Sequence, residues 1–287
     1  MFLKRKNKYL YTDFADELIE ENKAHGYVHQ KKKGKYVTVS HIHVLDKENP
    51  LQKEPGNYVS ISFTSLKEND QRKELIETIR YYLSFLMKEK SDIQRILVVG
   101  LGNRSFVSDA LGPKVAGEVL VTAHLFQQED RSWLNGMRNV AVLAPGVMGQ
   151  TGLESSVIIE NVAKAYLPDL IVAVDALATR YLKRINRVIQ MSDTGIQPGS
   201  GIGNHRRRID QSTVHVPVIA IGVATVTSIQ AIIEELLEKN HMEACEYEKL
   251  EQNMIVTPKS MDEELTYLSM IIASGMNRAF HSGLESG

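Results

Sequence analysis

Two aspartates stand where the sequence changes from a buried apolar run to a polar loop. Asp175 follows four apolar residues in IVAVDALATR, and Asp109 lies in GLGNRSFVSDALGP, directly after the apolar run RILVV. A carboxylate next to a buried strand needs a partner, a shifted pKa or contact with solvent. We therefore interpret Asp109 and Asp175 as a pair of functional acids, with helix capping as the alternative role for each.

A pair of carboxylates is sufficient to hydrolyse a peptide bond. Two carboxyl groups held a few ångströms apart share one proton, because both cannot ionise cheaply. The ionised group activates a water molecule, and the protonated group polarises the scissile carbonyl. Such a pair titrates as a unit and needs neither a metal nor a covalent intermediate. The sequence therefore predicts acid–base hydrolysis with no cofactor.

Two further loops offer supporting groups. The segment APGVMGQTGLES places Gly146, Gly149 and Gly152 between a strand and a helix, where backbone N–H groups can polarise a carbonyl. A tight connection without a ligand is the alternative. Asp193 begins the Asp-Thr-Gly triplet of pepsin-like and retroviral proteases, but those folds are all-β. We interpret Asp193 as a supporting residue in a long, glycine-rich, flexible loop that is followed by Arg206–Arg208.

Other kinds of site have weaker support. The glycines at 100 and 102 lack the third glycine and the acidic residue of a dinucleotide-binding loop. His41 and His43 share one face of a strand, but no third ligand is nearby, so no metal site is expected. The sequence has no G-x-S-x-G motif. The single cysteine, Cys245, excludes an internal disulfide and fits a reducing compartment.

Composition fits a globular cytoplasmic protein. The chain has 287 residues, 43% of them hydrophobic, and a net charge of −1. It can therefore bury a large core, and its charge gives no indication of a nucleic-acid partner. Apolar runs stay well below the ~18 residues of a membrane span. The basic N-terminus lacks the apolar run of a secretory signal, so we expect a cytoplasmic location and no membrane partner.

The elements that must position the two aspartates alternate between strand and helix. We predict an α/β fold with a mostly parallel central sheet and helices on both faces, because the central apolar runs show no alternation. In such sheets ligands bind at the carboxyl ends of the strands. The buried strands are expected at 95–102, 140–146, 169–177 and 216–223, a weaker strand at 187–192, alternating strands at 36–45 and 58–63, and helices at 12–23, 71–88, 112–126, 155–166, 226–239 and 262–281.

The same loops closely resemble those of the germination protease family. The resemblance rests on GLGNRSFVSDALGPKV, APGVMGQTGLES, DALATR, QMSDTGIQPGSGIGN and PVIAIGV, with weaker matches toward both ends of the chain. It implies a fold related to the hydrogenase-maturation endopeptidases. It also implies an atypical aspartic-type endopeptidase that degrades small acid-soluble spore proteins in the spore core during germination. Asp109 and Asp175 occupy the positions of the proposed catalytic aspartates.

The resemblance also implies a zymogen and a homotetramer. The prosegment junction corresponds to YTDFA at residues 11–15, so we expect processing at the Asp13–Phe14 bond. We divide one α/β domain, 1–287, into a candidate prosegment at 1–13, an N-terminal elaboration at 14–94, a core sheet at 95–240 and a C-terminal helix at 253–287. The segment between the last two parts is shorter than is usual in the family. Two alternatives stay open: an inactive paralogue that binds spore proteins, and a metal-dependent maturation endopeptidase.

Overall fold

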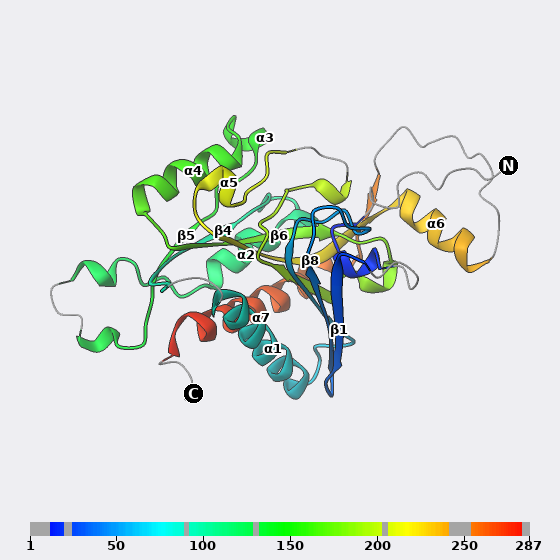
Figure 1. Ribbon diagram of the computed structural model, residues 1–287, viewed down its shortest axis with the longest axis horizontal. Coiled ribbons are helices and arrows are strands. Elements are labelled where there is room, and N and C mark those ends of the chain that lie inside the picture. The colour runs from blue at the N-terminus through cyan, green and yellow to red at the C-terminus, as the bar shows by residue number, and fades with distance from the viewer. Residues whose placement is uncertain are drawn as a thin grey trace.

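One mixed sheet runs through the molecule in the computed structural model (Figure 1). Its main path has the strand order β1-β2-β3-β7-β8-β6-β4-β5, and β9 pairs with β8. The structure describes residues 12–19, 25–88, 92–128, 132–202, 206–240 and 254–282. The strands are β1 Tyr27–Lys33, β2 Val37–Val44, β3 Gly56–Phe63, β4 Arg95–Gly100, β5 Asn139–Leu143, β6 Leu170–Ala178, β7 Val188–Ser192, β8 Val218–Ser228 and β9 Ile255–Val256.

The four strands with uninterrupted apolar sequences form the parallel half of the sheet. β5, β4, β6 and β8 lie side by side in that order, and each pairs in parallel with the next. Alternate residues face opposite sides of the sheet, so Val98 and Val172 enter one buried cluster while Leu97 and Ile171 enter another. Both faces of these strands are therefore buried, which confirms the predicted α/β class.

The other half of the sheet is antiparallel. β7 pairs antiparallel with β8, and β3, β2 and β1 continue the sheet in the same way. The parallel part is thus less extensive than the sequence suggested, because alternation in β2 and β3 identifies half-buried strands without showing what they pair with. β1 was not predicted, since six of its seven residues are exposed and three are lysines. Lysines are typical of a protected edge strand.

Helices cover both faces of the parallel half (Figure 1). α1, α2 and α7 pack on one face, and α4 and α5 pack on the other. The helix expected over 112–126 ends at Glu118, because the backbone is already extended at Val119. The helices are α1 Asn69–Lys88, α2 Leu111–Glu118, α3 Met148–Thr151, α4 Ser155–Tyr166, α5 Gln211–Val214, α6 Ile229–Lys239 and α7 Met261–Phe280.

The N-terminal segment is anchored to the sheet rather than helical. Of the helix expected over 12–23, only a single 3₁₀ turn, Ala15–Glu17, forms among the described residues, and residues 20–24 lie outside them. Phe14 is fully buried, and Arg184 binds both Asp16 (2.9 Å) and Glu17 (2.8 Å). These tertiary contacts override the local helix propensity.

Residues 1–11 of the candidate prosegment lie outside the described residues, and so do Cys245 and most of the segment between α6 and α7. Within the described ranges, no helix combines the length and the apolar character needed to cross a bilayer.

Candidate active site

Asp109 and Asp175 line one cavity at the carboxyl ends of β4 and β6. β4 ends beside Val174, whose carbonyl accepts a hydrogen bond from the N–H of Leu101 at 2.8 Å, while β6 continues to Ala178. Asp175 is the residue after Val174, and Asp109 follows the loop that leaves β4. The structure thus brings the two predicted carboxylates to one cavity, toward the edge of the sheet where ligands bind in such folds.

A tight turn holds the Asp109 carboxylate. Asp109 ends a short 3₁₀ helix, Val107–Asp109, and its Oδ2 accepts a hydrogen bond from the N–H of Asn103 at 2.9 Å. Gly102 has a φ of +107°, and a Cβ there would lie 2.1 Å from the carbonyl oxygen of Asp109. The second glycine of the GLGN motif is therefore required for the chain to close around Asp109.

The first turn of α2 lies directly against the strand ends. A Cβ at Gly112 would lie 2.2 Å from the carbonyl oxygen of Leu101 and 2.4 Å from that of Val174. Only glycine permits this approach of helix to strand. Since Asp109 lies three residues before Gly112, the close approach also sets how near Asp109 comes to Asp175.

The two carboxyl groups have different electrostatic environments. Asp175 is 4% exposed, and burial raises its pKa well above the usual value, with the negative charge of Asp109 adding to the shift. The N–H of Ala176, which donates to Oδ1 at 2.9 Å, and the charge of Arg206 oppose that pKa shift. Burial also raises the pKa of Asp109, opposed by the Asn103 N–H and by Arg206. The pKa of Asp175 is therefore raised further than that of Asp109, which favours the protonated form at Asp175 and the ionised form at Asp109.

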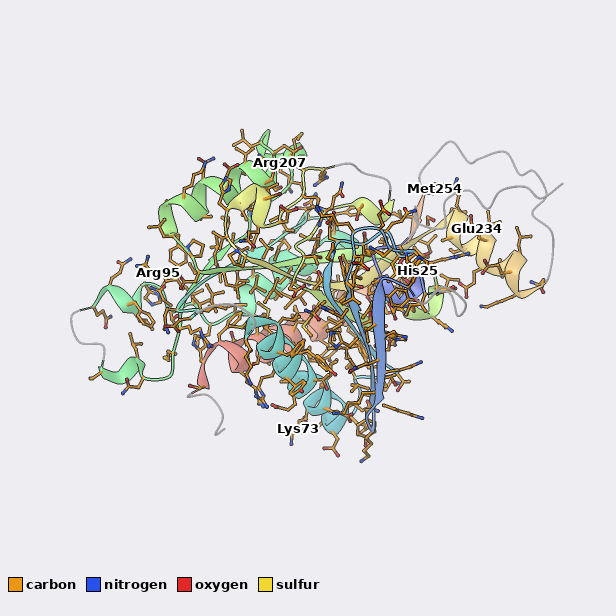
Figure 2. All side chains as sticks on the ribbon, in the orientation of Figure 1. His25, Lys73, Arg95, Arg207, Glu234 and Met254 are labelled. Atoms are coloured by element: carbon orange, nitrogen blue, oxygen red, sulfur yellow. The ribbon has the colours of Figure 1, made fainter. Side chains whose placement is uncertain are left out.

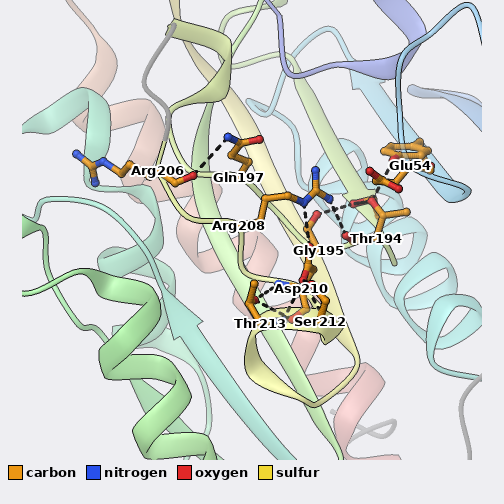
Figure 3. A network of polar contacts seen from close by, with 11 residues as sticks. Glu54, Thr194, Gly195, Gln197, Arg206, Arg208, Asp210, Ser212 and Thr213 are labelled. Atoms are coloured by element: carbon orange, nitrogen blue, oxygen red, sulfur yellow. Dashed lines mark hydrogen bonds and ion pairs between the residues drawn. The ribbon is translucent and has the colours of Figure 1, made fainter. Parts of the chain in front are cut away.

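Arg206 lines the same cavity and is held by a polar network in the loop after β7. Gln197 Nε2 donates to the Arg206 carbonyl at 3.3 Å, and an isolated antiparallel bridge joins Ile196 to Ile209. Figure 3 shows the Arg206 guanidinium extending away from this network. The described part of the loop, which the sequence suggested to be flexible, is thus tied down, and it supplies a cation near the acid pair.

Arg207 also lines the cavity, beside α4 (Figure 2). Its Nη1 lies 3.4 Å from Glu160 Oε2, so Arg207 has a carboxylate partner of its own. The cation that lowers the pKa of Asp109 and of Asp175 is Arg206.

Asp13 brings a third carboxylate to this cavity. Its Oδ2 accepts from the N–H of Ala178 at 2.8 Å, and its Oδ1 accepts from Ser200 Oγ at 2.5 Å. The Asp13 carbonyl accepts from Lys53 Nζ and from Gln190 Nε2, both at 3.0 Å. The residue singled out at the expected processing junction is therefore fixed beside the acid pair.

The remaining candidates lie away from the cavity lining. Gly146 and Gly152 both have φ of +72°, as their glycine identity suggested, but the lining comes from residues 154–156, at the start of α4. Asp193 accepts two hydrogen bonds from Asn57, at 2.7 and 2.9 Å, and so joins the end of β7 to β3. Residues 154–156 were not predicted individually, but the glycine loop before them indicated that a helix begins at this point.

The two histidines on β2, His41 and His43, hydrogen-bond to a neighbouring strand. His41 Nε2 and His43 Nδ1 lie 2.9 Å and 3.1 Å from the same oxygen, Asn57 Oδ1. Within the residues that the structure describes, no group of three or more His, Cys, Asp or Glu side chains is arranged to hold a metal ion.

Comparison with known proteins gives a consistent family. The sequence profile of the germination proteases matches residues 7–242. The germination protease of Caldanaerobacter subterraneus is 34% identical over 302 residues, covering 94% of this chain and 93% of its own, and that of Clostridium acetobutylicum is 37% identical over 313 residues, covering 96% of each. The Oceanobacillus iheyensis germination protease is 40% identical over 236 residues, which are 80% of this chain and 64% of the relative.

A solved structure of the [NiFe] hydrogenase maturation protease HycI from Thermococcus kodakarensis aligns with a TM-score of 0.37 and 18% identity, over 68% of this chain and 98% of that one.

The fold and the cavity define an α/β protein with one buried and one half-buried carboxylate toward the carboxyl edge of its parallel strands. By sequence, the chain belongs to the germination protease family.

Proposed function

We propose that this protein is an endopeptidase that hydrolyses small acid-soluble spore proteins in the spore interior during germination, with Asp109 and Asp175 as its catalytic residues. The observation that supports this most strongly is that both carboxylates line one cavity and that burial raises both pKa values. Family membership supports the substrate class and the spore location.

The two aspartates have unequal roles in the proposed mechanism. Asp109 keeps the negative charge, because the Asn103 N–H and the nearby Arg206 favour its ionised form. It acts as general base and removes a proton from the attacking water. Asp175 keeps the proton, because it is deeply buried beside the charge of Asp109. It donates a hydrogen bond to the scissile carbonyl and then protonates the leaving amine. The proton that Asp109 took from water then passes to Asp175, which restores the starting state of the pair.

Amide substitutions test this assignment. Asp109→Asn and Asp175→Asn should each lower the rate of cleavage of a purified small acid-soluble spore protein by about 10²–10⁴-fold, the usual contribution of a general acid or base. Both variants should fold, because Asn can accept the backbone hydrogen bond that each carboxylate now accepts. Folding is checked by thermal unfolding. Full activity in either variant would exclude that residue from the chemistry.

Two outcomes separate the proposal from its alternatives. If the wild-type chain binds the spore protein without cleaving it, it is an inactive paralogue. If EDTA abolishes cleavage and a divalent metal restores it, the protein is a metal-dependent endopeptidase and the acid-pair mechanism is wrong. Activity unchanged by EDTA is the expected result, since the proposed steps use only the two carboxyl groups.

Processing at the Asp13–Phe14 bond remains a proposal. Its support is that Asp13 lines the cavity of the acid pair, whereas the fully buried ring of Phe14 means that the segment must move before the bond is cut. N-terminal sequencing after mild acid incubation should give a new terminus at Phe14 in the wild type and the original terminus in Asp109→Asn. An unchanged wild-type terminus contradicts the proposal. The tetramer implied by the resemblance is checked by analytical ultracentrifugation.

A further inference from the structure

Two buried hydroxyl groups in the candidate active site have no hydrogen-bond partner within the described part of the chain. Ser156 and Thr225 both line the cavity that holds Asp109 and Asp175. Ser156 is 3% exposed and Thr225 is fully buried, yet Ser156 Oγ and Thr225 Oγ1 are unpaired. A buried hydroxyl without a partner costs stability, so each such group in a folded protein calls for an explanation.

An irregularity in the sheet brings Thr225 to the cavity. Along the β6–β8 ladder, Leu177 pairs with Ala224 and Ala178 pairs with Val226, so Thr225 is an extra residue on β8. A β-bulge of this kind reorients a side chain locally, and bulges are common beside active sites. Thr225 therefore lies opposite Leu177 and Ala178 of β6, which are two and three residues after Asp175. This corresponds to roughly 7–10 Å along the strand, or two to three residues of an extended peptide.

Ser156 reaches the cavity from the opposite layer of the fold. It is the second residue of α4, whose N-terminus has no side-chain cap. Backbone N–H groups in the first turn of a helix lack partners within that helix. The neighbouring Ser155 hydroxyl is already used, because it donates to the carbonyl of Gly146 at 2.9 Å. The Ser156 hydroxyl and the helix terminus therefore present unused polar groups to the same cavity.

We propose that Ser156 and Thr225 are substrate-binding residues, whose hydroxyls bind main-chain groups of the extended peptide that the acid pair cleaves. This inference rests on the proposed function. The two hydroxyls come from different layers and can hold the peptide at two points while its scissile bond lies at Asp109 and Asp175. A bound peptide would also give both hydroxyls the partners that they lack in the free protein.

Removing each hydroxyl tests the proposal, with a purified small acid-soluble spore protein as the probe. Ser156→Ala and Thr225→Val should each lower kcat/KM about tenfold, the effect of losing one hydrogen bond to the substrate. Neither variant should lower the Tm, because each removes a buried group that is unpaired in the free protein. Thr225→Ser keeps the hydroxyl and should retain most of the wild-type kcat/KM.

Thr227 supplies a matched control. It lies on the same strand, it is fully buried, and its Oγ1 is also unpaired among the described residues, but it is not one of the residues that line the cavity. Thr227→Val should therefore leave kcat/KM within about twofold of the wild type.

Three outcomes overturn the inference. If Ser156→Ala and Thr225→Val cleave at the wild-type rate while Asp109→Asn and Asp175→Asn do not, the inference fails and the proposed function stands. If Thr225→Val and Thr225→Ser both lower the Tm and the activity, the Thr225 side chain stabilises the fold by packing and does not bind the substrate. If the wild-type chain does not cleave the spore protein, the proposed function fails and the inference fails with it.

Discussion

At the scale of single residues, the candidate site depends on an unequal pair of acids. Asp175 is buried and Asp109 is half-buried in the same cavity, and Asp175 has the larger upward shift of its pKa. Asp109 accepts a hydrogen bond from the N–H of Asn103, across a loop, whereas Asp175 accepts one from the N–H of Ala176, the residue that follows it. Such differences in burial and hydrogen bonding separate the pKa values of two chemically identical side chains, so that one can act as the acid and the other as the base.

Arg206 should control the pH range of activity. Its positive charge lowers the pKa of both aspartates, so Arg206→Gln should raise both. In the proposed mechanism, Asp109 must be ionised, which sets the rising limb of the pH–rate profile, and Asp175 must be protonated, which sets the falling limb. Both limbs of kcat/KM against pH should therefore move to higher pH, and activity on the acid side should fall.

Arg207 is the matched control for this experiment. It lines the same cavity but pairs with Glu160, so Arg207→Gln should leave both limbs in place. A shift of equal size in both variants would show that the effect comes from the net charge of the loop. A shift to lower pH in Arg206→Gln would contradict the assigned direction.

At the scale of elements, the site depends on how closely α2 approaches the strand ends. Gly112→Ala should lower stability by about 1–3 kcal/mol or more, because the new Cβ meets backbone atoms that no side-chain rotation can clear. The same change displaces Asp109 from Asp175, so kcat/KM should fall at least tenfold even where the variant remains folded. Urea unfolding and cleavage kinetics measure the two effects.

The matched substitution is Gly149→Ala, in the glycine loop before α4. A Cβ at Gly149 has no atom within 4 Å among the described residues, and this glycine does not have a left-handed φ. Stability and kcat/KM should both stay close to wild type. A tenfold loss of activity here would restore Gly149 to the candidate site.

The sequence predicted those helices and strands whose hydrophobic pattern directly reflects which of their faces are buried. Residues buried on both faces gave uninterrupted apolar runs, so the parallel strands were found, and α4 was located at its exact bounds, 155–166. Asp109 was found in the loop after β4, and Asp175 was found because it interrupts the apolar run of β6. Strand order in the antiparallel half was not predictable, since it depends on pairing between distant segments such as β3 and β7. The position of Thr225 in the cavity was not predictable either, because a β-bulge in an apolar strand has no recognisable sequence pattern.

At the scale of the whole molecule, one hydrophobic cluster joins the two halves of the sheet. It contains Val59 and Ile61 of β3 in the antiparallel half and Val172 and Val174 of β6 in the parallel half. Leu75 and Ile79 of α1 and Leu268 and Ile272 of α7 belong to the same cluster. The N-terminal elaboration therefore lacks a separate core of comparable size, which favours unfolding as one unit with the core sheet.

Native-state hydrogen exchange tests this cooperativity. The most protected amides of β3 and β6 should open with the same free energy, and Ile61→Ala should lower both values equally, by about 2–5 kcal/mol, the usual cost of truncating a buried isoleucine. The physical reason is that Ile61 is fully buried in the shared cluster, so its loss weakens every strand that the cluster supports. If Ile61→Ala weakens the β3 amides while the β6 amides keep their wild-type protection, the antiparallel strands form a separate unit. In that case the acid pair would belong to a domain that can fold without them.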